Sequence, residues 1–274
     1  MPLSAVYTVP HPPLLIPEVG RGEELLIRDT LLSMERVGQE IAEIKPSTII
    51  VISPHAPYMN DRFVISADHS LYGDMRRFRA PLVSVRKNID VSLASKIYTE
   101  SLCKSIPVLL HEEDMFVDHG AIVPLYFIDK YFRDYNLVLI SLSGLSTEAH
   151  FMFGQSIAKA ASSFEGRVVL IASGDLSHRL TQDGPYGFTP EGPVFDRIIT
   201  EYLRNGQVDE IRNIDPDLAE KAAECGLRSL IIMSGALSGQ DFSSEFFSYE
   251  GPFGVGYAVC GFDLEDNLRF ADLP

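Results

Sequence analysis

The sequence predicts a three-layer α/β/α fold, a single domain over residues 1–274 in which helices cover both faces of a central, mostly parallel mixed sheet. Short β-branched runs alternate along the chain with longer runs of helical periodicity. Two runs, Thr48–Ser53 and Val168–Ala172, are almost continuously apolar, as expected of central strands buried on both faces. Apolar residues make up 46% of the chain, enough for a large core, and no repeat or linker divides it.

The elements follow from these patterns in chain order. The β-rich runs predict strands at Ser4–Val9, Thr48–Ser53, Leu137–Leu142, Val168–Ala172, Glu245–Tyr249 and Gly254–Phe262. Apolar residues at helical spacing predict helices at Glu23–Lys45, Val91–Ile106, Glu148–Phe164, Pro193–Arg204 and Asp217–Leu237. The Gly- and Pro-rich segment Asp183–Pro193 predicts a surface loop, whose Tyr186 and Phe188 either line the mouth of a pocket or dock on the surface.

Charge and cysteine content restrict the functions that are open to this chain. A formal charge of −15 disfavours a nucleic-acid or anionic-membrane partner, so we expect a small molecule or another protein. Three cysteines without CxxC spacing cannot form a disulfide framework, and the N-terminus has no signal-peptide pattern. No apolar run approaches the ~20 residues that cross a bilayer. These features predict a cytoplasmic protein without a transmembrane segment.

Three histidines follow directly on predicted strands, and they carry the first functional signal. His11, His55 and His178 should converge on one crevice, because ligands of open α/β sheets bind beyond the carboxyl ends of the strands. His11 and His55 lie in Pro-rich turns, Pro10–Pro13 and Pro54–Pro57, which hold an imidazole in a fixed direction. Such a setting suits a metal ligand, although a histidine at a strand end can also simply bond a neighbouring carbonyl.

The third ligand of such a metal site should be a carboxylate or a thiolate. Glu250 is our first choice, because it follows a β-like run and precedes Gly and Pro residues that allow close backbone approach. Glu224 and Cys225 are the alternatives, but they fall within a helical pattern, where an exposed Glu and a buried Cys are ordinary.

The remaining histidines divide into two groups. His119 and His178 lack the Pro-framed setting and are assigned to proton transfer or substrate orientation, with Asp118 and Asp175 as residues that orient them or form surface pairs. The other histidines are expected on the surface, namely His69, His111 and His150. No phosphate-binding glycine motif and no G-x-S-x-G elbow is present, so neither a nucleotide site nor a serine hydrolase is supported.

Five ordered motifs resemble a known family: PHPP at 10–13, SPHAP at 53–57, DHGAIVPLYF at 118–127, ASGDLSHRL at 172–180 and SYEGPFGVGYAV at 248–259. Together they are similar to the LigB-like class III extradiol ring-cleavage dioxygenases, and more narrowly to the branch of AmmeMemoRadiSam gene sets. The resemblance implies iron(II) held by His11, His55 and Glu250, with His119 and His178 as the active-site pair. Memo-like relatives have a cysteine in the third ligand position.

The resemblance also implies a reaction and partners. The expected reaction is insertion of O2 into a catechol-like diol or an aminophenol at a non-haem Fe(II) centre, which zinc can replace in purified protein. Because the branch often carries a downstream AMMECR1-type domain, such a partner, if needed, would here be a separate protein. A homo-oligomer is an open alternative that the sequence does not decide. The alternatives are a non-catalytic, Memo-like metal-binding or protein-interaction module and a zinc-dependent hydrolase.

Overall fold

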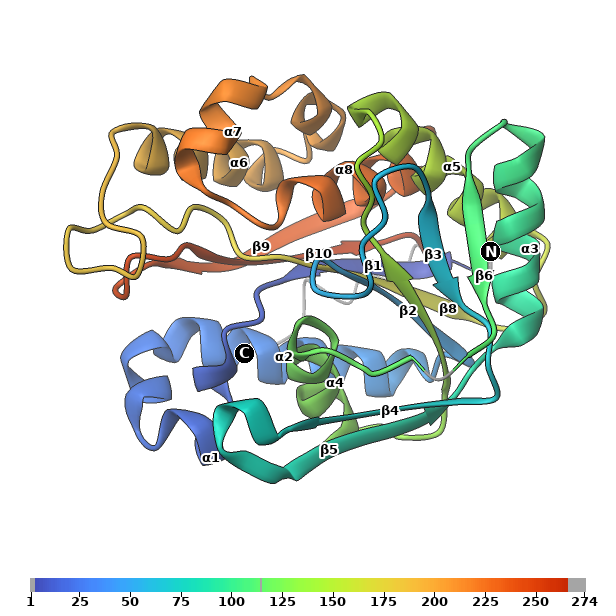
Figure 1. Cartoon of the computed structure of the whole chain (residues 1–274), viewed down its shortest axis with the longest axis horizontal. Coiled ribbons are helices and arrows are strands. Elements are labelled where there is room, and N and C mark those ends of the chain that lie inside the picture. The colour runs from blue at the N-terminus through green and yellow to red at the C-terminus, as the bar shows by residue number, and fades with distance from the viewer. Residues whose placement is uncertain (1–2, 114, 266–274) are drawn as a thin grey trace.

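The computed structural model describes residues 3–113 and 115–265, so the ends of the expected 1–274 domain lie outside the described residues (Figure 1). The strands are β1 (Leu3–Val9), β2 (Thr48–Ser53), β3 (Phe63–Ser66), β4 (Ser70–Met75), β5 (Ala80–Asn88), β6 (Val108–His111), β7 (Asn136–Ser141), β8 (Val168–Ser173), β9 (Ser243–Glu250) and β10 (Tyr257–Asp263). The helices are α1 (Pro17–Gly20), α2 (Arg28–Ile44), α3 (Val91–Cys103), α4 (His119–Asp129), α5 (Thr147–Ser162), α6 (Glu191–Arg204), α7 (Pro216–Ala222) and α8 (Leu227–Leu237).

The central sheet is mixed and mostly parallel, which confirms the predicted fold class. Its strand order is β6-β3-β7-β2-β8-β1-β10-β9, with β7, β2, β8 and β1 parallel to one another. The antiparallel pairings lie toward the edges, at β3 with β7, β10 with β1 and β9 with β10. Because β2, β8 and β1 are parallel neighbours, the residues that follow them emerge side by side at one edge of the sheet.

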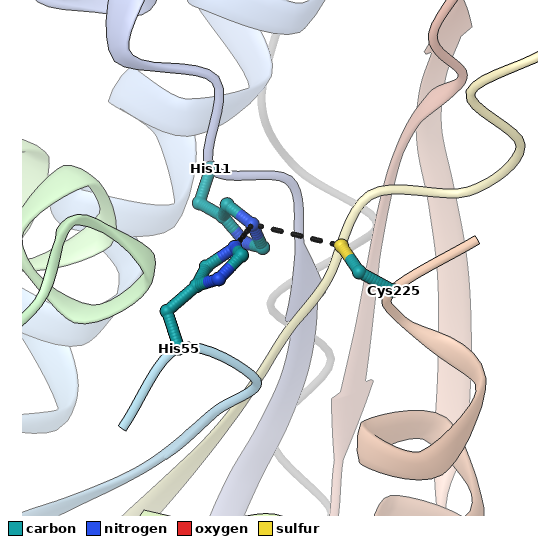
Figure 2. A group of neighbouring side chains, drawn as sticks. All are labelled: His11, His55 and Cys225. Carbon is teal, nitrogen blue, oxygen red and sulfur yellow. Dashed lines mark hydrogen bonds between the residues drawn. The ribbon is translucent and has the colours of Figure 1, made fainter. Parts of the chain in front are cut away.

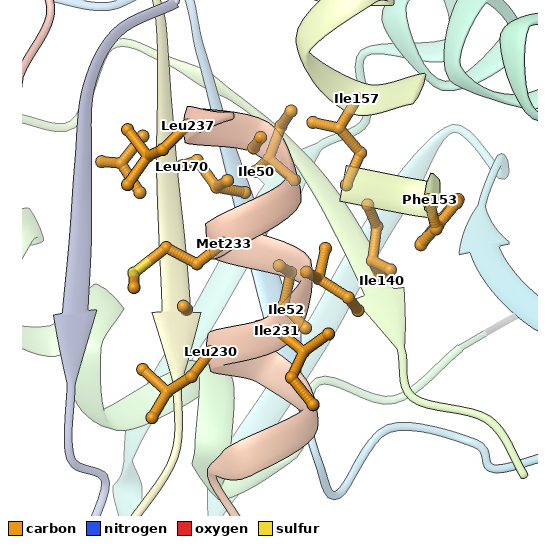
Figure 3. Close-up of a cluster of buried hydrophobic side chains, with 14 of the residues drawn as sticks. Ile50, Ile52, Ile140, Phe153, Ile157, Leu170, Leu230, Ile231, Met233 and Leu237 are labelled. Carbon is orange, nitrogen blue, oxygen red and sulfur yellow. The ribbon is translucent and has the colours of Figure 1, made fainter. Parts of the chain in front are cut away.

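Each face of the sheet has its own hydrophobic core. Alternate residues of the central strands face opposite ways: Ile50, Ile52 and Leu170 join one core, while their neighbours Ile49 and Val51 join the other. Helices α3, α5, α6, α7 and α8 cover the first face (Figure 1), and Figure 3 shows side chains of α8 packed among those of the strands there. On the second face lie α2, α4 and the two-stranded β4–β5 hairpin (Figure 1).

The structure departs from the predicted elements in three places. The β4–β5 hairpin and the strands β3 and β6 were not predicted; β3 and β6 have only four residues each, too few for a clear strand pattern. The helix predicted from Glu23 begins at Arg28, after a separate 3-10 turn, and leaves Leu25 64% exposed. The helix predicted over Asp217–Leu237 is broken into α7 and α8. Among the described residues, no helix is both long and apolar enough to cross a membrane.

Candidate metal centre

His11 and His55 meet at the carboxyl ends of β1 and β2. Their Nε2 atoms lie 3.0 Å apart, with the two rings nearly perpendicular. The separation is smaller than the span of about 4.2 Å available to two nitrogens bound to one ion by ~2.1 Å bonds. His11 is 2% exposed, whereas His55 is exposed, so one side of the pair is open to solvent. The predicted convergence of these two imidazoles is therefore present.

Ser173, the last residue of β8, fixes the tautomer of His11. Its Oγ donates a hydrogen bond of 2.5 Å to the carbonyl oxygen of Gly120 and lies 2.9 Å from Nδ1 of His11. Because the single hydroxyl proton is used on Gly120, Nδ1 of His11 must donate to Ser173, which leaves the Nε2 lone pair pointing at His55. Burial lowers the pKa of His11 well below its ordinary value, and so do the nearby charges of His55 and His178. The imidazole is thus neutral and ready to bind a cation.

The third side chain of this group is Cys225, as Figure 2 shows. Its Sγ lies 3.7 Å from Nε2 of His11, and the ligand atoms of His11, His55 and Cys225 all lie within 4.8 Å of one another. Burial, and next the charge of Asp175, raise the pKa of the thiol well above its ordinary value, so the sulfur is protonated without a cation. A bound metal ion would reverse this balance and hold the thiolate.

The structure does not bring Glu250, our first choice for the third ligand, to this group. Its Oε2 accepts hydrogen bonds of 2.6 Å from both the backbone N–H and the Oγ of Thr30, in the first turn of α2. The carboxylate thus caps a helix whose first N–H groups have no partners within the helix. The residue predicted as a ligand therefore bonds the first turn of α2 and lies outside the group of His11, His55 and Cys225.

Cys225 reaches the histidines because the predicted helix is broken around it. Ala223 adopts a left-handed conformation with φ of 53° and ends α7, so Cys225 lies in the turn before α8. Gly226 packs on Gly174, just after β8, so closely that a Cβ on Gly174 would lie 2.2 Å from Cα of Gly226. Gly226, which lies inside the predicted helical pattern, is the sequence signal that could have indicated this break. Glu224 turns away and accepts a hydrogen bond from the N–H of Leu227.

His119 stacks on the exposed ring of His55, with ring centroids 4.2 Å apart. It is the first residue of α4, and the preceding Asp118 caps that helix by accepting hydrogen bonds from the N–H of Gly120 and from Oγ of Ser53. Burial lowers the pKa of His119 to about 3, with smaller effects from the charges of His11, His55 and Arg77. His119 is therefore a neutral hydrogen-bonding group at neutral pH.

His178 lies close to Cys225 and Asp175. One of its ring nitrogens lies within 4.8 Å of both Cys225 Sγ and a carboxylate oxygen of Asp175, which forms a second group of ligand atoms. Asp175 also accepts a hydrogen bond of 2.8 Å from the backbone N–H of His11, and burial raises its pKa to about 6. The buried Nδ1 of His178 has no hydrogen-bond partner among the described residues. Tyr186 from the predicted loop packs edge-on against the ring of His178, with centroids 5.4 Å apart.

The other histidines lie away from this centre. His69 is exposed and His111 half-buried in β6. The surface placement of His150 was wrong: the residue is fully buried in α5, where Nδ1 lies 2.9 Å from the carbonyl oxygen of Ser146 and the ring packs against Phe63. His150 is buried because it lies on the face of α5 that packs against β3, and the spacing of apolar residues did not show this.

A metal ion fits the residues at this centre. The ring nitrogens of two histidines and a thiol converge, and in the described part of the chain Asp118 Oδ2 and His178 Nδ1 are buried without a hydrogen-bond partner. The model of the catalytic LigB subunit of aromatic ring-opening dioxygenases matches residues 5–260. The chain belongs to the LigB family. LigB-type extradiol dioxygenases are non-haem metal-dependent enzymes, and His11, His55 and Cys225 form the possible metal site of this member.

Several relatives of this LigB protein match most of its length. The chain is 41% identical to protein CA_C1420 of Clostridium acetobutylicum over 97% of its own length, but it spans only 59% of that relative. It is 24% identical to the 2-aminophenol 1,6-dioxygenase beta subunit of a Pseudomonas species, covering 94% of this chain and 93% of the relative. Uncharacterized protein JW3007 of Escherichia coli K12 shares the fold, with a TM-score of 0.65 at 18% identity, over 95% of this chain and 99% of that one.

Proposed function

We propose that this protein is a non-haem iron(II) extradiol dioxygenase that opens the ring of a catechol-like diol or an aminophenol. The observation that carries the proposal is the His11–His55 pair in a LigB chain, with Nε2 atoms 3.0 Å apart and with His119 stacked on His55. The relative named as a 2-aminophenol 1,6-dioxygenase subunit supports the substrate class. Iron(II), if held by His11, His55 and Cys225, would supply the open coordination positions and the redox chemistry that the reaction of an aromatic diol with O2 needs.

The residues around the pair handle the substrate and its protons. His119, with a pKa of about 3, stays neutral and accepts a hydrogen bond from a substrate hydroxyl. His178 offers a buried Nδ1 without a partner among the described residues, and it exchanges protons with the reacting oxygen. The exposed edge of His55 leaves room for a flat ring to approach.

The test is to load the protein anaerobically with iron(II) and to measure O2 uptake and ring-opened product with a panel of catechols and aminophenols. His11→Ala should lose both metal and activity. His119→Ala and His178→Ala should keep the metal and lose about 10²–10⁴-fold in rate, as expected when one positioned acid/base is removed. His69→Ala, which alters an exposed histidine outside the centre, is the control and should behave as wild type. Normal turnover by both His119→Ala and His178→Ala would contradict these roles.

The thiol of Cys225 favours a second candidate, a zinc centre of structural or hydrolytic type. Imidazole and thiolate ligands suit zinc, and a site with three protein ligands leaves a position for an activated water. Two results together would favour this candidate over the dioxygenase. The zinc-loaded protein would hydrolyse esters or amides without O2, and the iron-loaded protein would consume no O2 with any diol.

A further inference from the structure

A large cleft lies at the end of the sheet opposite the metal centre. Its volume is about 1330 Å³, and its lining includes Ser47, Asn136 and Arg167, which stand at the amino ends of β2, β7 and β8. His11 and His55, in contrast, follow the carboxyl ends of β1 and β2. Because these strands are parallel, the cleft and the metal centre lie at opposite ends of the strands. The cleft is therefore a separate place for a ligand to bind.

One wall of this cleft is the free edge of strand β5. Seven consecutive residues, Leu82–Asn88, line the cleft. Alternate side chains of a strand point to opposite faces, so an unbroken run of lining residues indicates that the cleft follows the edge of the strand. The other edge of β5 pairs with β4, whose Tyr72 carbonyl oxygen in turn accepts a hydrogen bond from the N–H of Val117. Among the described residues, no backbone hydrogen bond covers the free edge of β5 from Leu82 to Lys87.

The two ends of this edge differ in how they are held. Near the end of β5, the ammonium group of Lys87 donates a 3.1 Å hydrogen bond to the carbonyl oxygen of Arg133 and lies 2.8 Å from the carboxylate of Asp129. Near the beginning of β5, the side chain of Leu82 is 95% exposed. Figure 1 shows β5 as the outer strand of the hairpin. The edge is thus anchored at Lys87 and accessible at Leu82.

The cleft is cationic, although the chain as a whole carries a formal charge of −15. Three acidic residues line it, Glu18, Asp129 and Asp134, against six cationic ones, Lys45, Arg86, Lys87, Lys130, Arg133 and Arg167. Some of these cations are engaged: Lys130 pairs with Glu35 at 2.7 Å, and Arg167 donates a 2.8 Å hydrogen bond to the carbonyl oxygen of Ile44. Lys45 and Arg86 are exposed, and within residues 3–113 and 115–265 neither side chain has an ion-pair or hydrogen-bond partner. These two charges are available to an anionic ligand.

We propose that the free edge of β5 binds an acidic peptide segment of a partner protein, which adds in extended conformation as a further strand of the hairpin. Backbone hydrogen bonds to an exposed strand give such a complex its affinity, and side chains give it specificity. Lys45 and Arg86 match carboxylates of the peptide. A small anion would leave most of the edge uncovered. A second copy of this chain fits poorly, because pairing of β5 with itself brings the same cations together.

The first test measures binding of a fluorescent hexapeptide that alternates Glu and Val and is blocked at both ends. Wild type should bind it with a Kd below about 1 mM at low salt and should not bind the same peptide with Lys in place of Glu. Arg86→Gln and Lys45→Gln should each weaken binding about 2- to 5-fold, the effect of one exposed ion pair. Arg197→Gln is the matched control, because Arg197 is exposed on α6, on the other face of the sheet, and should bind as wild type does.

Two further measurements test the strand pairing itself. The Glu–Val peptide with alternate backbone nitrogens methylated keeps its charges but loses donors to the edge, so it should bind about 10-fold more weakly or worse. Bound peptide should slow hydrogen exchange at Leu82–Arg86 and leave exchange in α6 unchanged. Metal-free and metal-loaded protein should bind the peptide equally, because the cleft and the metal centre lie at opposite ends of the strands.

The proposal is overturned if wild type does not bind the Glu–Val peptide, or if the Lys–Val or the methylated peptide binds as tightly. Displacement of the peptide by inorganic pyrophosphate, with no protection of Leu82–Arg86 from exchange, would assign the cleft to small anions instead. A dimer in sedimentation that protects Leu82–Arg86 without peptide would assign the edge to a second copy of this chain. Equal weakening by Arg197→Gln and Arg86→Gln would show that only net charge matters, which also overturns the proposal.

Discussion

Replacing Glu250 with Gln distinguishes a helix cap from a metal ligand. The carboxylate accepts two hydrogen bonds of 2.6 Å from Thr30 in the first turn of α2, and it lies outside the group formed by His11, His55 and Cys225. Hydrogen bonds to a charged group contribute about 1.5–3 kcal/mol each, and a charge at a helix N-terminus about 0.3–1 kcal/mol more. Because Gln keeps an acceptor oxygen, we expect Glu250→Gln to lower the free energy of unfolding by about 1–3 kcal/mol.

The assay combines urea denaturation of the metal-free protein with metal content after reconstitution. Glu250→Gln should bind as much metal as wild type, whereas Cys225→Ser should bind less at limiting metal. Glu245→Gln is the matched control, because Glu245 also lies on β9 and pairs with α2, through Arg36 at 2.6 and 2.7 Å, but is 32% exposed. A surface pair of this kind contributes about 0–1 kcal/mol. The reasoning fails if Glu250→Gln loses metal while its unfolding free energy is unchanged.

Three further predictions concern the support of the centre and the buried histidine. Ser173→Ala removes the group that fixes the His11 tautomer and should weaken metal binding about 10- to 100-fold in a chelator competition; unchanged affinity would contradict the tautomer argument. Gly174→Ala places a Cβ 2.2 Å from Cα of Gly226, so it should lower both thermal stability and metal occupancy. If the variant is normal in both, the contact between the two glycines does not hold Cys225 in place. Burial lowers the pKa of His150 to about 4, so this histidine is neutral in the folded state. Wild type should therefore lose stability as the pH falls from about 6.5 to about 4, because in this range only the unfolded state gains the proton. Urea denaturation at several pH values should show that wild type loses at most about 3 kcal/mol more unfolding free energy than His150→Leu over this range. Parallel pH profiles of the two proteins would exclude this effect of His150.

The strongest sequence patterns predicted the sheet and the proximity of His11 and His55. Thr48–Ser53 could only be a strand buried on both faces, because a continuous β-branched run has no polar side to expose. The Pro-framed turns placed His11 and His55 at the ends of two strands, and the parallel arrangement of β1, β8 and β2 then brings their ring nitrogens together. Burial pattern and local stiffness are properties that a short stretch of sequence carries by itself.

The third side chain of the centre was decided by tertiary structure. Glu250 and Cys225 each lie in a sequence pattern that allows a metal ligand. Neither pattern contains the long-range contacts that decide which of the two lies beside the histidines. Glu250 is drawn to the N-terminus of α2, 220 residues away in the chain, because those N–H groups need an acceptor. Cys225 is turned toward His11 because Gly226 fits against Gly174 after β8. Both outcomes depend on close packing between segments distant in sequence, which no periodicity within either segment can encode.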